Sequence, residues 1–299
     1  MHKHNLGVID VGSNAIRLSI GRPTPKGRIK LFINARDPIR LGDEAFGRGE
    51  LSASTFKKVV AAFKNYRKIF DENEILGYRA VATSAIREAK NGMELIDEIH
   101  EKTKVRLEVI SGQEEADLIY LALNNALGYP KAPAAYMDIG GGSVEIIISQ
   151  NDKIQYSKSL KIGTVRLMKM AADNIYDRDF FTNHVRKEIE GAPQTSVKIA
   201  GGSGGNVARL GKLRKIILDK KNEHEISIHE LEEIIERLFS STYEERIEKF
   251  KMRPDRADVI LPASIIVLEF MRYFKIDNFE IPDTGLKEGV LLDLWSHMK

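Results

Sequence analysis

The residues best suited to chemistry lie within positions 136–149, where Asp138-Ile-Gly-Gly-Gly-Ser-Val-Glu145 sets two carboxylates around three glycines. An apolar run precedes the glycines and a β-branched run follows them, which predicts strand, tight turn and strand. Because glycine lacks a Cβ, the turn can approach a ligand closely and point its N–H groups at anionic oxygens. Ser143 adds a hydroxyl, and Asp138 and Glu145 suit a divalent cation beside phosphate. The pattern predicts a phosphate site, with a glycine-rich structural hairpin as the alternative.

A second hairpin near the N-terminus repeats this pattern. Residues 8–20 align with the first stretch at one constant offset, so that Asp10 matches Asp138 and Arg17 stands where Glu145 does. Two copies of one phosphate hairpin, each opening about half of the chain, predict duplicated domains that face each other across a cleft. Ligands commonly bind at such domain interfaces.

An arginine follows the strand expected over residues 78–82. Thr83 or Ser84 can cap the next helix, and the Asn-Gly pair ending at Gly92 is expected to stop it. Arg87 then lies in the first helical turn at the carboxyl end of a strand, where open α/β sheets bind ligands. Helix N-termini attract anions, and arginine can grip phosphate with two hydrogen bonds. The alternative is a surface arginine paired with a nearby glutamate.

A pair of glutamates opens another helix after the strand expected over residues 105–110. Ser111 and Glu114 have the S-x-x-E spacing of a capping box, which gives Glu114 a structural role. Glu115 has no such role and lies at a helix start, which favours the ionised carboxylate. Near a phosphate site it is a candidate base for water. The alternative is an ordinary favourable charge at a helix start.

Composition is that of a globular protein of two ordinary domains: 299 residues, 42% hydrophobic and 30% charged. A net charge of +3 argues neither for nor against nucleic acid. The lack of cysteine excludes disulfides and thiolate metal sites and fits a reducing cytoplasm. No apolar run approaches membrane-spanning length, and the N-terminus enters the first strand at once. We expect a cytoplasmic protein with domains 1–125 and 126–299, divided at a segment rich in glycine and proline.

The second half contains a third corner able to receive an anion. A strand expected over 196–200 runs into the glycine loop 201–205, and Asn206 begins a helix. This loop does not match G-x-x-x-x-G-K-[ST], so no Walker A site is expected. An apolar helix expected over 259–271 suits either the core or a dimer interface. Six basic residues after the loop could hold a polyanion, although a solvated face is the favoured reading; they are Arg209, Lys212, Arg214, Lys215, Lys220 and Lys221.

Together these segments resemble the exopolyphosphatase and guanosine pentaphosphate phosphohydrolase (Ppx/GppA) family, in its short two-domain form. The resemblance covers nearly the whole chain, and six motifs in family order make it specific. It implies an α/β fold of two ribonuclease-H-like domains, of the actin, acetate and sugar kinase and heat-shock ATPase type, flanking a central cleft. The motifs are Asp10-Val-Gly-Ser-Asn14, Ala82-Thr-Ser-Ala-Ile-Arg87, Ser111-Gly-Gln-Glu-Glu-Ala116, Asp138-Ile-Gly-Gly-Gly-Ser-Val-Glu145, Arg256-Ala-Asp258 and Gly285-Leu-Lys-Glu-Gly289.

The resemblance also implies roles for individual residues. Glu115 matches the proposed catalytic glutamate, whereas Asp138 and Glu145 match acids around the metal and the attacking water. Gly205 and Asn206 depart from the family, which usually has a threonine in this part of the third loop. Residues expected to bind substrate phosphate are Asp10, Ser13, Asn14, Arg17, Thr83, Arg87, Gly140, Gly141, Gly142, Ser143, Gly202, Ser203 and Gly204.

The expected activity is exopolyphosphatase: in-line attack of water on the terminal phosphoryl group of inorganic polyphosphate. Glu115 would act on the water, with Mg²⁺ (or Mn²⁺) near Asp138 and Glu145. A guanosine pentaphosphate (pppGpp) 5′-phosphohydrolase would use the same residues, and a kinase of the same fold is a further rival. A non-catalytic alarmone- or polyphosphate-binding regulator is disfavoured, because carboxylates do not help anion binding without a metal. We expect no nucleic-acid or membrane partner, and pairing into a homodimer stays open.

Overall fold

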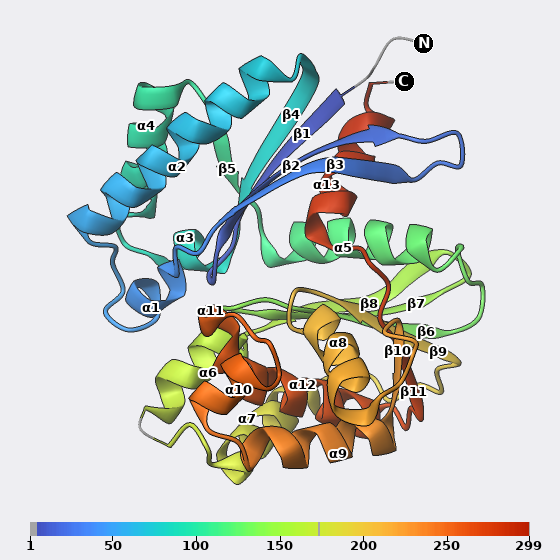
Figure 1. Cartoon of the computed structure of the whole chain (residues 1–299). Helices are drawn as coiled ribbons and strands as arrows, with labels where there is room; N and C mark the ends of the chain where they lie inside the picture. Colours follow the sequence, from blue (N-terminus) through green and yellow to red (C-terminus); the bar gives the residue numbers. More distant parts are fainter. Residues whose placement is uncertain (1–4, 173, 299) are drawn as a thin grey trace. The chain divides into compact units, whose positions relative to one another are not determined.

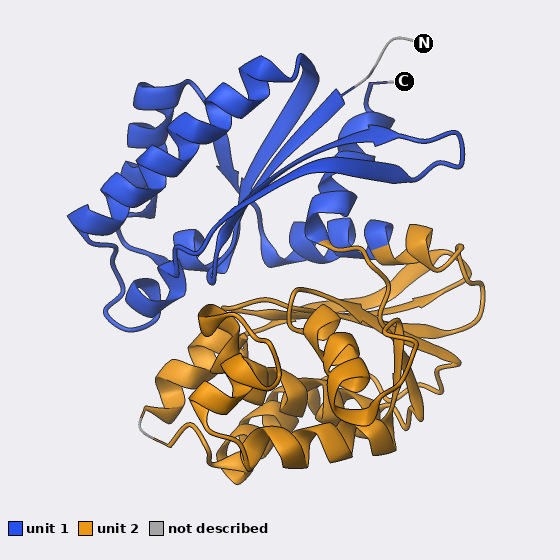
Figure 2. Ribbon diagram, in the orientation of Figure 1, with its two compact units in different colours: residues 1–122, 286–299 blue, residues 123–285 orange. Residues whose placement is uncertain are grey.

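The computed structural model describes residues 5–172 and 174–298, which fall into two compact units (Figure 2). Of the described residues, unit 1 contains 5–122 and 286–298, and unit 2 contains the rest up to residue 285. Each unit has one mixed sheet flanked by helices, with five strands in unit 1 and six in unit 2 among the described residues (Figure 1). The predicted class of two α/β domains is therefore confirmed.

The sheet of unit 1 has the order β3-β2-β1-β4-β5. β1, β2 and β3 form an antiparallel meander, and β4 and β5 run parallel to β1 on its other side, which is the strand order of a ribonuclease-H-like domain. The strands are β1 (Asn5–Val11), β2 (Ile16–Pro23), β3 (Ile29–Asp37), β4 (Ile75–Ala82) and β5 (Leu107–Val109). The helices are α1 (Leu41–Ala45), α2 (Ala53–Glu72), α3 (Ser84–Glu88), α4 (Gly92–Thr103), α5 (Gly112–Ala126) and α13 (Leu286–Ser296).

Every residue of β1 is buried, and because alternate residues of a strand point to opposite sides, its side chains pack on both faces of the sheet. On β1, Ile9 belongs to an apolar cluster with Phe63 of α2 and Leu95 of α4. Val8 belongs instead to a cluster with Leu291 of α13. Figure 1 shows α2 and α4 on one side of the sheet and α13 on the other. Packing on both faces holds β1 and β2 firmly, and with them the turn that joins them.

The sheet of unit 2 has the order β10-β11-β9-β6-β7-β8, with an antiparallel meander β6-β7-β8 and β9 parallel to β6. Its hairpin β6–β7 thus repeats the placement of β1–β2. The strands are β6 (Ala134–Ile139), β7 (Val144–Gln150), β8 (Lys153–Leu160), β9 (Ile199–Ser203), β10 (Glu225–Ser227) and β11 (Asn278–Glu280). The helices are α6 (Thr164–Ala171), α7 (Arg178–Ile189), α8 (Val207–Leu218), α9 (Ile228–Phe239), α10 (Tyr243–Glu248), α11 (Pro254–Ala257) and α12 (Ile260–Tyr273).

The apolar helix expected over 259–271 is α12, and every residue from 260 to 271 is buried. Its side chains, such as Ile265 and Phe270, join the core of unit 2 together with Phe181 of α7 and Ile234 of α9. Of its two expected uses, the core is the one observed.

The division between the units differs from the expected one. It falls between residues 122 and 123, inside α5, rather than at 125. The expected assignment of residues 286–298 to the second domain is wrong, because α13 packs against the sheet of unit 1. Val290 and Leu291 of α13 share an apolar cluster with Leu6 and Val81. The C-terminal helix therefore completes the first domain.

Two local expectations also need correction. The helix after β4 ends at Glu88, and Gly92 begins α4 instead of ending the preceding helix. The strand expected over 196–200 is β9, which runs later and includes Gly202 and Ser203 of the expected loop. Glycines can stand in a strand where neighbouring chains approach closely. Here a Cβ on Gly202 would lie 2.6 Å from the ring of Phe279.

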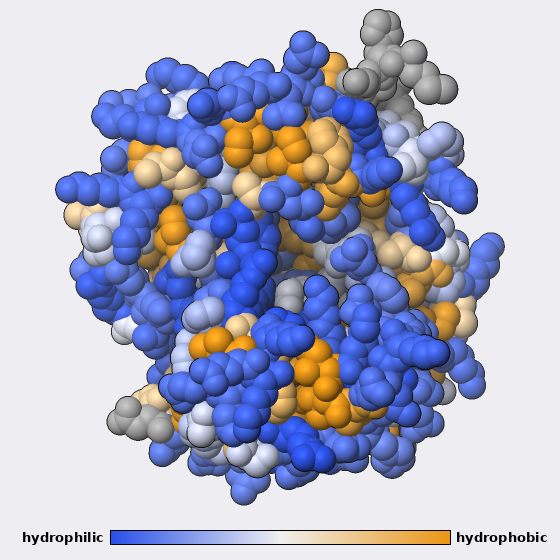
Figure 3. Space-filling model, viewed as in Figure 1, coloured by the Kyte–Doolittle hydropathy of each residue, from blue (hydrophilic) through white to orange (hydrophobic). Residues whose placement is uncertain are grey.

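Hydrophilic side chains cover most of the face in Figure 3, and the hydrophobic ones lie in separate areas between them. Among the described helices, none combines the length and the apolar character that crossing a bilayer would require.

Candidate active site

The first hairpin carries an ion pair at the end of its strands. Asp10 of β1 and Arg17 of β2 are register partners, so their side chains lie on the same face of the sheet. Arg17 Nη1 donates to Asp10 Oδ2 at 3.1 Å, and the Asp10 side chain is largely buried. The pairing of these two predicted phosphate-binding residues holds the guanidinium in place at the mouth of the turn.

The turn of this hairpin is held by its neighbours. Its Gly12 N–H donates to the carbonyl of Ala15 at 3.2 Å, and the Ser13 carbonyl accepts from Gly42 N–H at 2.8 Å. The Ser13 hydroxyl lies 3.0 Å from the Ser84 hydroxyl, at the start of α3. The predicted residues Ser13, Asn14 and Thr83 are all buried. The structure therefore places the predicted residue Ser13 beside Ser84, which the sequence suggested only as a possible helix cap.

Arg87 and Glu115 meet, although 28 positions separate them (115 − 87). Arg87 lies on the short helix α3 and donates from Nη1 to the Ile110 carbonyl at 2.7 Å. The same nitrogen lies 3.5 Å from Glu115 Oε2. Glu115 is 5% exposed at the start of α5. The expected alternative, in which Arg87 pairs with a neighbouring surface glutamate, is not what the structure shows.

Glu114, the neighbour of Glu115, has a structural role, although only the serine half of the predicted capping box is observed among the described residues. Its backbone N–H donates to Ser111 Oγ at 3.1 Å, and its carboxylate forms an ion pair with Arg79. Arg79 also contacts Asp293 of α13 at 3.2 Å. The two adjacent glutamates thus separate into a surface ion-pair network and a buried carboxylate beside an arginine.

The second hairpin carries two carboxylates in place of an ion pair. Asp138 of β6 and Glu145 of β7 are register partners on one face. On one side, Ser203 of β9 pairs with Asp138 in the sheet and donates its hydroxyl to Oδ1. On the other side, Ser159 of β8 pairs with Glu145 and donates its hydroxyl to Oε1 at 2.7 Å. A polar row therefore crosses four neighbouring strands.

The glycine turn of this hairpin is tied back through its carbonyl groups. The Gly140 carbonyl accepts from Thr164 N–H at 3.1 Å, and the Gly141 carbonyl accepts from Val165 N–H at 2.8 Å. The Gly142 carbonyl accepts from Arg166 Nε, also at 2.8 Å. Within the described residues, no hydrogen bond joins the backbone N–H of Gly141 or Gly142 to a protein acceptor. Carbonyls facing α6 and N–H groups facing away give the turn the character of an anion nest.

The third glycine segment lies beside this turn. Gly204 has a φ of +101°, a backbone conformation that favours glycine, and a Cβ there would lie 2.8 Å from the Ile139 carbonyl. Since Ser203 also contacts Asp138, the predicted residues Gly202, Ser203 and Gly204 join the second hairpin in one local site. Ser143 is buried at the same turn.

Several residues of this corner went unassigned by the sequence reasoning. Thr164 and Arg166 begin α6 and hold the glycine turn, as described above. Arg256 Nη1 donates to Asn206 Oδ1 at 2.6 Å, and Asn206 Nδ2 donates to Thr164 Oγ1 at 3.3 Å. The sequence contained a signal for Thr164 and Arg166, since Gly163-Thr164 follows a strand and opens a helix. The chain Arg256–Asn206–Thr164 joins residues far apart in sequence, and only the fold reveals it.

Asp138 and Glu145 are suitable Mg²⁺ ligands by chemistry. Among the described residues, no group of three or more histidine, cysteine, aspartate or glutamate side chains is arranged to hold a metal. Mg²⁺ is often held by only one or two carboxylates, with substrate phosphates and water completing its shell. Two carboxylates side by side on one face of the sheet fit that mode.

Comparisons with known proteins agree with the fold and with these motifs. The family model of the Ppx/GppA phosphatase family matches residues 22–297. Exopolyphosphatase 1 of Mycobacterium tuberculosis is 25% identical, over 96% of this chain and 87% of the relative. Exopolyphosphatase 2 of the same species is 26% identical, over 97% of this chain and 98% of the relative.

Comparison with solved structures also finds exopolyphosphatase and PPX-GPPA proteins. An exopolyphosphatase from Cytophaga hutchinsonii has a TM-score of 0.88 at 26% identity, covering 99% of each chain. The PPX-GPPA enzyme of Aquifex aeolicus has a TM-score of 0.81 at 27% identity, covering 97% of this chain and 99% of that one. With the family model matching far more than half of its length, this chain belongs to the Ppx/GppA phosphatase family.

Proposed function

We propose that this phosphoanhydride hydrolase is an exopolyphosphatase, which releases orthophosphate from the end of inorganic polyphosphate by in-line attack of water. The observation that carries the proposal is the second hairpin. There, backbone N–H groups of Gly141 and Gly142 have no protein acceptor among the residues that the structure describes, and they lie beside the carboxylate pair Asp138 and Glu145. Phosphoryl transfer depends mainly on positioning and charge neutralisation, and this corner offers groups for both.

In this proposal the glycine turn binds phosphate oxygens through backbone N–H groups that need not reorganise. The bracing of its carbonyls by Thr164, Val165 and Arg166 supports a turn that is ready before substrate arrives. Asp138 and Glu145 would hold Mg²⁺, which would supply Lewis-acid neutralisation of charge on the phosphates. The hydroxyls of Ser159 and Ser203 keep the two carboxylates oriented for that task.

Glu115 is the proposed base that orients the attacking water and takes its proton. Burial at 5% exposure limits competition from bulk water. Arg87, 3.5 Å away, favours the ionised carboxylate that a base must have before it accepts a proton. Arg87 and Arg17 are in turn proposed to contact phosphate oxygens, because a guanidinium can donate two parallel hydrogen bonds.

Polyphosphate is the proposed substrate because both Mycobacterium tuberculosis relatives carry the name exopolyphosphatase. The third glycine segment agrees with this choice. Arg256 occupies the space beside Gly205, where an added Cβ would lie 2.2 Å from Nη2. That corner therefore presents a cation, which suits phosphate better than an uncharged base.

The test is phosphate release by the purified chain from tripolyphosphate, long-chain polyphosphate and guanosine pentaphosphate, each with MgCl₂ and with EDTA. We expect magnesium-dependent release from the polyphosphates at a higher kcat/KM than from guanosine pentaphosphate. A preference for guanosine pentaphosphate would replace the proposed substrate with the alarmone. Absence of release from all three would contradict the proposed hydrolysis, and ATP formation or consumption with an acceptor would then indicate a kinase.

A further inference from the structure

The basic run from Arg209 to Lys221 separates into two parts in the structure. In the later part, each of three cations is matched by acids. Arg214 Nε lies 2.9 Å from Glu230, Lys215 Nζ lies 3.6 Å from Glu223, and Lys220 Nζ lies 4.0 Å from Glu230. These side chains form a solvated, charge-compensated face, as the favoured reading of the sequence predicted.

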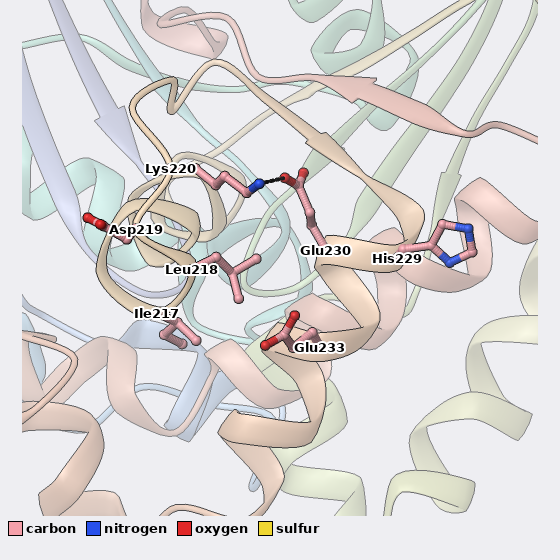
Figure 4. Close-up of a pocket in the computed structure, with 7 residues that line it drawn as sticks. All are labelled: Ile217, Leu218, Asp219, Lys220, His229, Glu230 and Glu233. Carbon is pink, nitrogen blue, oxygen red and sulfur yellow. Dashed lines mark ion pairs between the residues drawn. The ribbon is translucent and has the colours of Figure 1, made fainter.

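A surface pocket of about 520 Å³ lies at this later part (Figure 4). Figure 4 shows Lys220 directed at Glu230 on one side of it, with Glu233 nearby on α9. Asp219 contributes a further carboxylate to the lining. Since acids outnumber the lysine here, the pocket is a poor receptor for a polyanion, and none of the candidate site residues lines it.

Arg209, in the earlier part of the run, differs from these three cations, and so does Arg253, which lies outside the run. Within the part of the chain that the structure describes, neither forms an ion pair with an acidic side chain. Arg209 Nη2 donates to the carbonyl of Lys251 at 2.6 Å, which seats the guanidinium against the segment that carries Arg253. The pKa of Arg209 lies below its usual value because of burial and because of the positive charge of Arg253. Two cations thus stand together without compensation, a situation that an anion would relieve.

These two arginines continue the corner of the second hairpin. Arg209 lies three residues beyond Asn206, which is about 4.5 Å along the axis of α8. Arg253 precedes α11 and lies three residues before Arg256. Ser203 donates to Asp138, and Arg256 donates to Asn206, three residues after Ser203. The two arginines are therefore each three residues along the chain from a member of the Arg256–Asn206 bond of this corner.

We propose that Arg209 and Arg253 form a subsite for phosphate groups of the polyphosphate chain further from the cleaved end, and so favour long substrates. This inference rests on the proposed function, whose terminal phosphate occupies the glycine turn. A guanidinium pair binds a flexible polyanion well, because every repeat unit offers the same two non-bridging oxygens to two parallel N–H donors. Tripolyphosphate would be too short to engage it while its end lies in the turn.

The test compares the double variant Arg209→Gln/Arg253→Gln with the wild-type protein on tripolyphosphate and on polyphosphate of tens of phosphates. We expect kcat/KM on the long chain to fall about tenfold, and on tripolyphosphate to change by less than about twofold. The matched control Lys215→Gln/Lys220→Gln removes the same charge from cations that already have acidic partners. It is expected to keep both values.

If loss of the contact between Arg209 and Lys251 harms folding, the single variant Arg253→Gln takes the place of the double variant, because Arg253 is exposed. A long-chain kcat/KM that stays near the wild-type value in both variants would overturn the subsite, as would an equal loss on both substrates. Calorimetric binding of the two polyphosphates in EDTA separates this inference from the proposed hydrolysis. A protein that releases no phosphate, yet loses long-chain affinity selectively in the variants, would refute the hydrolysis and keep the subsite.

Discussion

The two hairpins of this chain share their backbone plan and differ in charge at one register position. In β1–β2, Asp10 stands opposite Arg17, and the two form an ion pair. In β6–β7, Asp138 stands opposite Glu145, and hydroxyls from both neighbouring strands donate to these carboxylates. The first corner is neutral within itself and offers a guanidinium, whereas the second gathers negative charge. The same topology thus provides one corner with a guanidinium and one with two carboxylates, which we propose to hold Mg²⁺ beside the phosphate-binding glycine turn.

The hairpins also differ in what holds their turns. The first turn is joined to α1 by the bond from Gly42 N–H to the Ser13 carbonyl, and Tyr66 braces its strands. The second turn directs three successive carbonyl groups to the first residues of α6. Backbone N–H groups can serve a ligand only when the peptide planes are fixed, so the second turn is the better prepared anion nest.

We expect the largest loss of activity when charge is removed from the second hairpin. Asp138→Asn keeps the size of the side chain and its bond from Ser203 but weakens the proposed Mg²⁺ site. We expect kcat/KM on polyphosphate to fall about 10³-fold, which corresponds to several kcal/mol of lost charge stabilisation. The matched control is Asp152→Asn, in the turn between β7 and β8, which should stay near the wild-type rate. A similar rate for both variants would remove Asp138 from the metal site.

A glycine exchange tests the bracing of the turns. A Cβ on Gly163 would lie 2.3 Å from the Gly142 carbonyl carbon, so Gly163→Ala must displace the second turn. We expect activity to fall by about one to two orders of magnitude, as overpacking commonly costs 1–3 kcal/mol. In the first hairpin, Gly12→Ala meets its nearest atom at 3.3 Å and should be milder. A smaller loss of phosphate release in Gly163→Ala than in Gly12→Ala would contradict the greater importance of the second turn.

The ion pair of the first hairpin should matter for binding. Arg17→Gln removes a proposed phosphate donor, and we expect KM to rise about tenfold with turnover changed by less than about threefold. Because this variant leaves the Asp10 carboxylate buried beside a neutral group, we expect the free energy of unfolding to fall as well. The double variant Asp10→Asn/Arg17→Gln removes both charges and should recover stability, measured by urea unfolding, without recovering KM. Recovery of KM in the double variant would show that Arg17 acts on Asp10 alone.

The smallest effect on activity is expected from a brace of the first hairpin. Tyr66 is buried and donates its hydroxyl to the Ile16 carbonyl and to Asp37 Oδ2 at 2.5 Å. Tyr66→Phe should lower the free energy of unfolding by about 2 kcal/mol, because Asp37 loses a buried donor. Burial and the Asp37 charge raise the pKa of Tyr66 above its ordinary 10.0.

A raised pKa in the folded state means that the stability from Tyr66 is fully present below pH 10.0 and is lost as pH rises above it. The wild-type protein should therefore lose stability more steeply than Tyr66→Phe above that pH in urea unfolding. Parallel slopes for the two proteins would show that this hydroxyl is not the group that titrates.

Local pattern was sufficient to predict the two hairpins. Glycines between apolar runs predict a turn. The constant offset between the stretches that contain Asp10 and Asp138 indicates a repeated unit. The same kind of reasoning separated Glu115 from Glu114, since a capping-box partner has its role defined within four residues. Both glutamates lie where that reasoning placed them.

What could not be predicted depends on contacts between distant segments. The return of α13 to unit 1 follows from Leu291 packing beneath β1, which no spacing in the sequence encodes. The strand register that joins Ser203 and Ser159 to the carboxylates is likewise a property of the sheet. The basic run shows the same limit, because Lys215 and Arg209 have equal charge in the sequence and only the fold supplies one of them with an acid.

Glu115 gives the most direct test of the central claim, that this chain hydrolyses the phosphoanhydride bond with a buried glutamate as base. The measurement is magnesium-dependent phosphate release from polyphosphate by the wild-type protein and by Glu115→Ala, with polyphosphate binding measured in parallel. Glu114→Ala is the matched control, because it removes the adjacent carboxylate. We expect turnover to fall by roughly 10² to 10⁴ in Glu115→Ala alone, with polyphosphate binding largely intact. Turnover of Glu115→Ala equal to that of the wild-type protein would contradict it.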